Sequence, residues 1–294
     1  MNVTKNEFKD RQLHIDGYLQ RVSAEQKENA EVSNHSRIAE NNDTITCYQT
    51  DKLMEQILHP DNLNKAYKRV KANKGAGGVD GMSVDELLTF LKDNKKQLVQ
   101  KLMEGKYKPK PARRVEIPKE TKGEFRKLGV PTVVDRVFQQ AITQVLSPIY
   151  EEQFSGNSYG FRPKRGAHDA LNQCQQNVND GYVYVVDMDL EKFFDTVCQS
   201  KLIELLSRTI KDNRLISLIH KYLNAGIISK GMFEKTDVGM PQGGPLSPLL
   251  SNIMLNELDK ELKRRGHRFV RYADDCMIFC KSRKSAVRTL NNIV

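Results

Sequence analysis

Two adjacent aspartates, Asp274 and Asp275, lie inside the apolar run FVRYADDCMIF of residues 269–279. Neighbouring carboxylates repel each other, and partial burial makes that repulsion more costly. A third carboxylate, Asp189, ends the strand-like run YVYVVDMDL of residues 182–190. If the two runs form neighbouring strands, the three carboxylates meet at one place. Hard divalent cations with oxygen ligands, of which Mg²⁺ is the common choice, would offset their repulsion.

Such a site has a defined chemistry. Two Mg²⁺ ions about 4 Å apart would polarise an attacking hydroxyl and stabilise a leaving pyrophosphate, and Mn²⁺ could take their place. The alternative is that the adjacent aspartates occupy a solvated turn and bind nothing. Their apolar flanks, and the further aspartate at a strand end, favour the metal site.

Composition narrows the class of protein. With 294 residues and 38% hydrophobic content, the chain can bury a sizeable core in one large domain or two subdomains. The formal net charge of +10 favours a polyanionic partner, nucleic acid before membrane, although a basic enzyme without such a partner remains the alternative. Five cysteines without a C-x-x-C pair indicate neither a disulfide framework nor a zinc site, which fits the cytoplasm. The sequence contains no apolar run long enough to cross a membrane.

The first half of the chain predicts an arm followed by helices and a hairpin. Residues 1–50 are polar, and we expect a mobile arm there. Ser83 and Glu86 have the spacing of a capping box, which predicts a helix that starts near Ser83 and ends near Gly105. Residues 106–127 show strand-like alternation of side-chain character on both sides of a turn at Lys122-Gly123, which predicts a β-hairpin with a basic face.

The second half predicts strands and helices that would carry the aspartates. Ser247 is the expected N-cap of an amphipathic helix, with Pro248 at its first position and Gly266 just beyond its end. The run around Asp274 and Asp275 predicts a β-hairpin with both aspartates at its tip. The fold class is therefore α+β, with an antiparallel sheet backed by helices beside a mixed helical and hairpin subdomain.

Several motifs together resemble one family. The sequence is similar to reverse transcriptases, and most closely to the reverse transcriptase and maturase proteins encoded by mobile bacterial group II introns. The resemblance covers roughly residues 50–294. It rests on YADD (272–275), DMDLEKFFDTV (187–197), PQGGPLSPLLSNI (241–253), SYGFRP (158–163), RRVEIPK (113–119) and GVDG (78–81).

The resemblance implies the fingers and palm of a right-hand polymerase. Beyond the arm, residues 51–175 would form the fingers with the start of the palm, and residues 176–294 the palm. In the family the chain continues past this point with the rest of the palm and a helical thumb. The resemblance therefore implies a piece that ends before the thumb and that alone has weak activity or none.

The resemblance also assigns the centre of the active site. Asp189, Asp274 and Asp275 would be the catalytic metal ligands. In the family an aromatic residue lies five positions beyond the first catalytic aspartate, and Phe194 lies five beyond Asp189. It would exclude a 2′-hydroxyl and so favour dNTPs, whereas its alternative role is core packing. Asp187, the other candidate, is expected to be a supporting acid.

Further residues are implied around that centre. Lys119 and Arg126 would bind the triphosphate, although a solvated basic hairpin is the alternative. Gln242 and Gly243 would lie against the nascent base pair, unless they form an ordinary turn. Arg162 could instead form an internal ion pair. The expected contacts for template phosphates are Arg113, Arg114, Arg162, Lys164 and Arg165.

The implied reaction is RNA-templated addition of dNTPs to a DNA primer 3′-hydroxyl, releasing pyrophosphate. The resemblance also implies binding of group II intron RNA as a splicing maturase, and a homodimer is a further expectation. One alternative is an RNA-binding splicing cofactor with an idle polymerase site. Another is a reverse transcriptase from a retron or a CRISPR locus.

Overall fold

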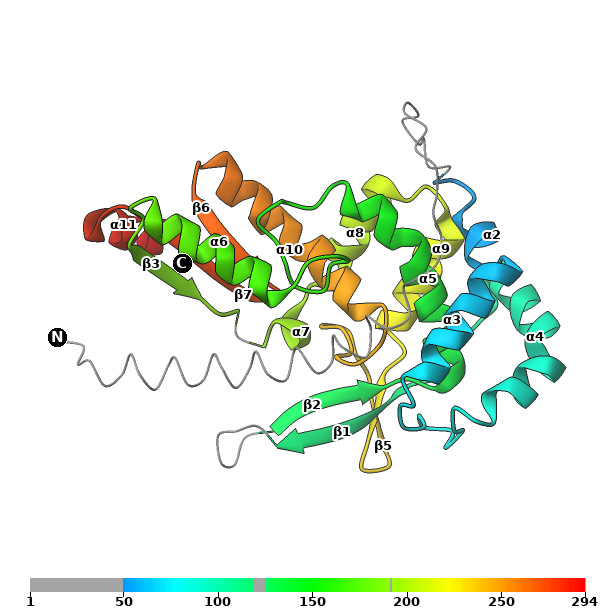
Figure 1. The fold of residues 1–294 in the computed structure, drawn as a ribbon. Coiled ribbons are helices and arrows are strands. Elements are labelled where there is room, and N and C mark those ends of the chain that lie inside the picture. The colour runs from blue at the N-terminus through cyan, green and yellow to red at the C-terminus, as the bar shows by residue number, and fades with distance from the viewer. Residues whose placement is uncertain (1–49, 119–124, 191, 294) are drawn as a thin grey trace.

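The computed structural model describes residues 50–118, 125–190 and 192–293, which form two sheets and a set of packed helices (Figure 1). The arm predicted for residues 1–50 and the turn at Lys122-Gly123 lie outside these residues, apart from Thr50. The strands are β1 Ala112–Pro118, β2 Phe125–Val130, β3 Tyr184–Met188, β4 Ile227–Ser229, β5 Met232–Glu234, β6 Arg268–Tyr272 and β7 Asp275–Cys280. The helices are α2 Leu53–Ile57, α3 Pro60–Ala72, α4 Leu87–Met103, α5 Val133–Glu151, α6 Ala167–Asn179, α7 Phe193–Thr196, α8 Gln199–Thr209, α9 Asn213–Leu223, α10 Ser247–Arg264 and α11 Arg283–Ile293.

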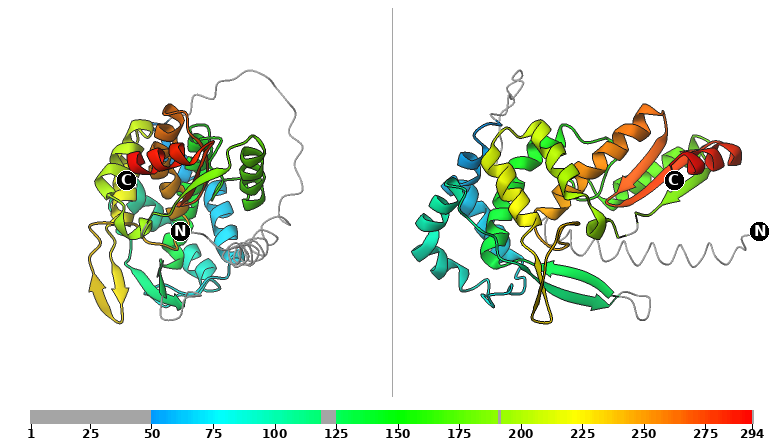
Figure 2. Two further views of the ribbon diagram at one scale, coloured as in Figure 1. Left: turned by 90° about the vertical axis from the view of Figure 1, so that its left-hand side faces the viewer. Right: turned by 180° about the vertical axis from the view of Figure 1, so that it is seen from behind.

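A three-stranded antiparallel sheet in the order β3-β7-β6 carries the predicted aspartates. Phe269 and Ile278 on one face pack with Leu262 of α10 and with α11. Val270 and Phe279 on the other face pack against α6. Figure 2 shows α6 and α11 on opposite sides of this sheet. The predicted α+β fold, with an antiparallel sheet backed by helices, is confirmed.

A second sheet has the order β2-β1-β4-β5. β1 and β2 form the predicted hairpin. β4 runs parallel to β1, with Ala112 paired to Ile227, and β5 returns beside β4. The sequence analysis had not predicted β4 or β5. Residues from the second predicted domain therefore extend a sheet of the first, while the domain division at residue 175 stays a prediction.

The helical core is organised around α5. Its N-cap Thr132 accepts a hydrogen bond from the backbone N–H of Asp135, and most of its length is buried. Ile142 and Leu146 on α5 are fully buried in one apolar cluster with Leu53 of α2 and Leu250 of α10. Met240 and Leu246 belong to the same cluster, which fixes the segment 239–246 that leads into α10.

The predicted helix ends are partly correct. Ser83 and Glu86 exchange capping-box hydrogen bonds of 2.7 and 3.3 Å, but α4 proper begins only at Leu87. Gly105 and Gly266 follow their helices with φ of 65° and 74°, as predicted. The expectation for Ser247 was wrong, because the N-cap position of α10 is Leu246. The Ser247 hydroxyl donates instead to the carbonyl oxygen of Pro241 at 2.6 Å.

Among the residues that the structure describes, no helix combines the length and the apolar character needed to cross a lipid bilayer.

Candidate active site

The register between β3 and β7 decides which aspartates meet. Met188 pairs with Cys276, so the next position along each strand sets Asp189 opposite Asp275. Side chains alternate along a strand, and therefore Asp187 shares the face of Asp189 and Asp275. The structure thus brings the two predicted strands together, with three carboxylates on one face at the end of the sheet.

Asp274 lies in the tight turn between β6 and β7. Tyr272 pairs with Asp275, which leaves Ala273 and Asp274 as the two loop residues. Ala273 has a φ of 56°, a left-handed conformation that a residue with a Cβ atom rarely adopts. Gly160 packs directly on this turn, since a Cβ atom at residue 160 would collide with the backbone of Ala273. The turn carrying the aspartates is therefore held in a strained conformation by its surroundings.

A buried ion pair also supports this turn. Arg271 and Asp259 of α10 are both fully buried. The Arg271 guanidinium donates two hydrogen bonds to the Asp259 carboxylate, from Nε to Oδ1 and from Nη2 to Oδ2, each of 2.7 Å. The Arg271 guanidinium also donates to the side chain of Asn252 at 3.1 Å and to Ser158 Oγ at 2.8 Å. Its remaining N–H donates to the carbonyl oxygen of Ala273 at 2.7 Å. Every guanidinium N–H thus has an acceptor, which removes the cost of an unmet buried donor.

The aspartates at the sheet end influence one another electrostatically. Although the Asp275 side chain reaches solvent, partial burial of its carboxyl group raises its pKa to about 6, helped by the negative charges of Asp274, Asp189 and Asp187. A negative charge is therefore costly at this position without a cation. This is the crowding expected of a site that binds divalent ions.

The donor set suits Mg²⁺ or Mn²⁺, because carboxylate oxygens are the ligands that these ions prefer. In the described part of the chain, no three His, Cys, Asp or Glu side chains are already gathered closely enough to enclose one ion. Asp187, Asp189 and Asp275 share a face of the sheet, and the charges of Asp187, Asp189 and Asp274 act on Asp275.

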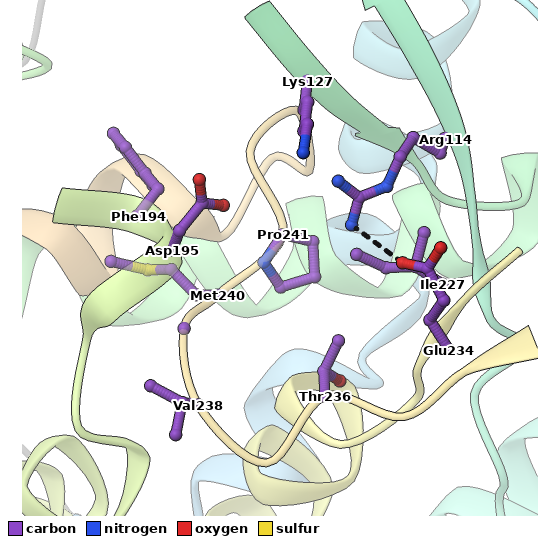
Figure 3. Close-up of a pocket in the computed structure, with 11 residues that line it drawn as sticks. Arg114, Lys127, Phe194, Asp195, Ile227, Glu234, Thr236, Val238, Met240 and Pro241 are labelled. Atoms are coloured by element: carbon purple, nitrogen blue, oxygen red, sulfur yellow. Dashed lines mark ion pairs between the residues drawn. The ribbon is translucent and has the colours of Figure 1, made fainter. Parts of the chain in front are cut away.

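Phe194 borders a cavity of about 290 Å³, whose lining includes none of Asp189, Asp274 and Asp275 (Figure 3). Phe194 lies on α7, five residues after Asp189. The centroids of its ring and the Phe193 ring lie 5.6 Å apart in an edge-to-face arrangement. Phe193 is buried in the core, whereas Phe194 is half-buried, packs against the same core and borders the cavity. Of the two neighbouring phenylalanines, Phe194 is therefore the more accessible. The other lining residues are Arg114, Lys127, Asp195, Ile227, Glu234, Thr236, Val238, Gly239, Met240 and Pro241.

The cations of this cavity come from one face of the β1–β2 hairpin. Arg114 Nη2 lies 3.5 Å from Oε2 of Glu234 on β5, and Lys127 of β2 also lines the cavity. Lys127 pairs with Glu116, whereas Arg126 pairs with Ile117, so the register places Arg126 on the other face of the hairpin. Lys127 had not been predicted as a site residue. Lys119 lies outside the described residues.

Gln242 and Gly243 lie against the edge of β2. The backbone N–H of Gly129 donates to the carbonyl oxygen of Gln242 at 2.7 Å. Gly243 has a φ of 126°, and a Cβ atom there would lie 2.9 Å from the carbonyl oxygen of Gly129. Glycine is therefore required at position 243 for the close approach of two backbones.

The basic residues predicted to bind the template differ in availability. Arg162 is buried and forms an ion pair with Glu151, which is the alternative given above for this residue. Its guanidinium also donates hydrogen bonds to backbone carbonyl oxygens. Arg113 donates to the carbonyl oxygen of Gly77, and Arg165 lies over the Tyr159 ring at 5.4 Å. Lys164 is exposed, and its ammonium group has no partner within the described residues.

Sequence reasoning missed the residues that hold the turn. Arg271 and Asp259 are charged residues on faces that are otherwise apolar, next to Phe269 and Leu262. Two opposite charges at core positions of separate elements are the signal that could have revealed the buried pair.

Comparison with known proteins places these features in a wider context. Residues 117–294 match the family model described as reverse transcriptase (RNA-dependent DNA polymerase). Protein YkfC of Escherichia coli strain K12 is 40% identical over 220 residues, which cover 73% of this chain and 58% of that protein. Group II intron-encoded protein LtrA of Lactococcus lactis subsp. cremoris is 39% identical over 209 residues, covering 71% of this chain and 35% of that protein.

The fold also resembles a solved structure. A chain of the partial Cas6-RT-Cas1–Cas2 complex matches 89% of this chain with a TM-score of 0.53 and 24% sequence identity, over 45% of its own length. This match supports the predicted polymerase fold of fingers and palm. The chain spans between about one third and three fifths of the length of the two curated relatives.

Replacing Asp274 by Asn should lower the pKa of Asp275, because one of the neighbouring charges that raise it is removed. The folded state of the parent holds the Asp275 proton more tightly than the unfolded state, whose carboxyl titrates near 3.8. This carboxyl therefore favours folding below about pH 4, and that contribution is lost as pH rises through about 6. Without divalent ions, Asp274→Asn should raise Tm at pH 7 and have little effect at pH 4.

The measurement is thermal unfolding in EDTA at both pH values, with NMR titration of the Asp275 carboxyl. The exposed Asp85 supplies the control Asp85→Asn, which should leave the titration unchanged. An Asp275 pKa that is the same in Asp274→Asn and in the parent would contradict the charge coupling.

Proposed function

Because the chain belongs to the reverse transcriptase (RNA-dependent DNA polymerase) family, we propose that it adds dNTPs to a primer 3′-hydroxyl on an RNA template. The observation that carries this proposal is the β3–β7 register, which sets Asp189 opposite Asp275 beside the turn of Asp274. The raised pKa of Asp275 supports it, since such crowded carboxylates need cations.

Asp189, Asp274 and Asp275 would hold two Mg²⁺ ions, or Mn²⁺, which activate the attacking hydroxyl and stabilise charge on the leaving pyrophosphate. Phe194 would lie under the sugar of the incoming nucleotide. Phe194 is only half-buried and borders a cavity, which supports a role in rejecting a 2′-hydroxyl in addition to its packing against the core.

Lys119 and Arg126 keep their proposed role of binding the triphosphate. Lys127, which lines the cavity and lies on the opposite face of the hairpin from Arg126, is a separate candidate for that role. Gln242 and Gly243 would present backbone to the nascent base pair. Their close contact with β2 supports this, because it keeps the segment fixed against that strand.

A separate groove of about 1160 Å³ between α5 and α6 offers a path for the template. Lys164, Arg165 and Arg69 line it, together with the exposed ring of Phe161. Ammonium and guanidinium groups beside an exposed aromatic ring are the usual partners of single-stranded nucleic acid. Arg113 and Arg114 remain proposed contacts further along the hairpin, whereas Arg162 is proposed to shape the groove rather than to touch phosphate.

The group II intron-encoded relatives lead us to propose a second role in binding intron RNA for splicing. The α3–α4 lysine surface, formed by Lys68, Lys71, Lys92 and Lys96, supports it. All four side chains are exposed, and none forms an ion pair with another described residue. Unpaired lysines on neighbouring helices attract phosphates without reading sequence.

The competing proposal is a splicing cofactor with an idle polymerase site. A CRISPR-associated reverse transcriptase is a further competing proposal. The likeness to a chain of the Cas6-RT-Cas1–Cas2 complex shows only that the fold is shared. The flanking genome discriminates, since an intron ribozyme would surround the gene of a maturase. The free thiols of Cys174, Cys198, Cys276 and Cys280 support the proposed location in the reducing cytoplasm.

Primer extension tests the main proposal. Asp274→Asn combined with Asp275→Asn should reduce extension by on the order of 10³-fold or more, because loss of metal stabilisation costs several kcal/mol in the transition state. The assay uses the longest reading frame that contains the chain, an RNA template, a DNA primer, dNTPs and Mg²⁺. Asp85→Asn is the matched control. Equal extension by parent and double variant would refute the aspartate site.

Phe194→Ala should relax the choice of sugar. Removing the ring opens space for a 2′-hydroxyl, so the preference for dNTPs over rNTPs should fall roughly 10- to 100-fold. Competition between dNTPs and rNTPs in single-nucleotide incorporation measures this ratio. Phe194→Tyr keeps the bulk and should keep the preference, and an Ala variant with the parent ratio would assign Phe194 to packing alone.

Exchanging all four lysines of the α3–α4 lysine surface for Gln should weaken intron RNA binding and reduce its salt dependence, by about one unit of slope per lost phosphate contact. Extension of a short primer–template should change little. Filter binding across a salt series measures both quantities. The control exchanges Lys201 and Lys260, which already pair with Glu204 and Glu257. Equal losses per exchanged lysine in the two variants would mean that only net charge matters.

A further inference from the structure

The buried cluster around Arg271 is placed to do more than fill the core. Its guanidinium joins three parts of the molecule: Asp259 and Asn252 on α10, Ser158 in the segment before α6, and the carbonyl of Ala273 in the turn. The backbone of Arg271 is fixed as well, since its N–H donates to Asn157 and its carbonyl oxygen accepts from Tyr159, both at 2.9 Å.

We propose that Arg271 is a positioning residue, which fixes the Asp274–Asp275 turn through its hydrogen bond to the Ala273 carbonyl and so sets where metal ions bind. The catalytic consequence rests on the proposed polymerase function. The structural part, that Arg271 holds the turn, stands independently of it.

Stability alone does not explain this ion pair. Burying two charges carries a desolvation cost, and apolar residues of similar volume often replace such a pair without loss of stability. What an apolar residue cannot supply is the fixed fork of a guanidinium, which binds Asp259 at two atoms while another N–H reaches the turn.

The turn needs such a support for two reasons. Ala273 has a φ of 56°, which a non-glycine residue holds only when its surroundings impose it. The carboxylates around the turn also repel one another, which favours any conformation that separates them. Gly160 confines the turn by direct contact, and Arg271 donates a hydrogen bond to the Ala273 carbonyl.

Arg271 acts through the backbone rather than by facing the carboxylates. It pairs with Cys276 across the hairpin, whereas Tyr272 pairs with Asp275, so Arg271 and Asp275 project from opposite faces of the sheet. Its charge is matched by Asp259 within the cluster. The expected effect of losing Arg271 is therefore a looser turn.

Two variants separate positioning from stability. Arg271→Lys keeps the charge but cannot reach Asp259, Asn252, Ser158 and Ala273 together. The double variant Arg271→Met, Asp259→Leu fills the same space with apolar groups and should stay folded. The control Ser158→Ala removes one acceptor of the guanidinium and leaves its bond to Ala273 intact.

The first readout is hydrogen exchange of the peptide covering 269–279, without metal ions. Exchange at the turn should be roughly tenfold faster in Arg271→Lys and in the double variant, as expected for loss of a charged hydrogen bond. Ser158→Ala should match the parent. Circular dichroism at the same temperature confirms that each variant is folded, and the double variant covers the case in which Arg271→Lys unfolds.

The second readout is Mn²⁺ binding followed by electron paramagnetic resonance. Both Arg271 variants should bind Mn²⁺ roughly 10- to 100-fold more weakly than the parent and Ser158→Ala, the range typical of residues that orient metal ligands. Folded Arg271 variants with the parent's turn exchange and Mn²⁺ affinity would overturn the proposal. If the parent itself binds no Mn²⁺, the metal site of the proposed function fails, and hydrogen exchange alone decides whether Arg271 holds the turn.

Discussion

The antiparallel register of β3 against β7 is the constraint on which the site depends. A slip by one residue would turn every side chain of β3 to the opposite face and separate Asp189 from Asp275. The apolar side chains prevent that slip, because Val186 and Ile278 pair on the face that α10 and α11 cover. The same packing that buries one face of the sheet therefore assembles the carboxylates on the other.

The second sheet and the helical core complete the site from a distance. The β1–β2 hairpin brings Arg114 and Lys127 to the cavity, and β5 supplies Glu234. The segment that precedes α10 closes it with Met240 and Pro241, and a backbone hydrogen bond ties Gln242 to β2. Residues from both predicted domains thus line one cavity.

Local signals allowed much of this to be predicted. The apolar run around Asp274 predicted the hairpin tip, and the Ser83–Glu86 spacing predicted a capping box that the structure contains. Long-range effects were not predictable in this way. β4 has only three residues and forms because it pairs with the distant strand β1. Ser247 does not cap α10, and its hydroxyl donates instead to the Pro241 carbonyl. The Arg271–Asp259 pair likewise depends on two elements meeting, which neither stretch of sequence reveals alone.

The order of strands in both sheets has a consequence for biosynthesis. β1 and β2 leave the ribosome long before β4, and β3 long before β7, so neither sheet can close until a late part of the chain has emerged. Contacts between distant residues also form slowly. During this interval β1 and β3 present unpaired edges, which are templates for association with other chains. A nascent chain that stalls before residue 275 is therefore exposed to aggregation, and chaperone capture should matter most at that stage of translation.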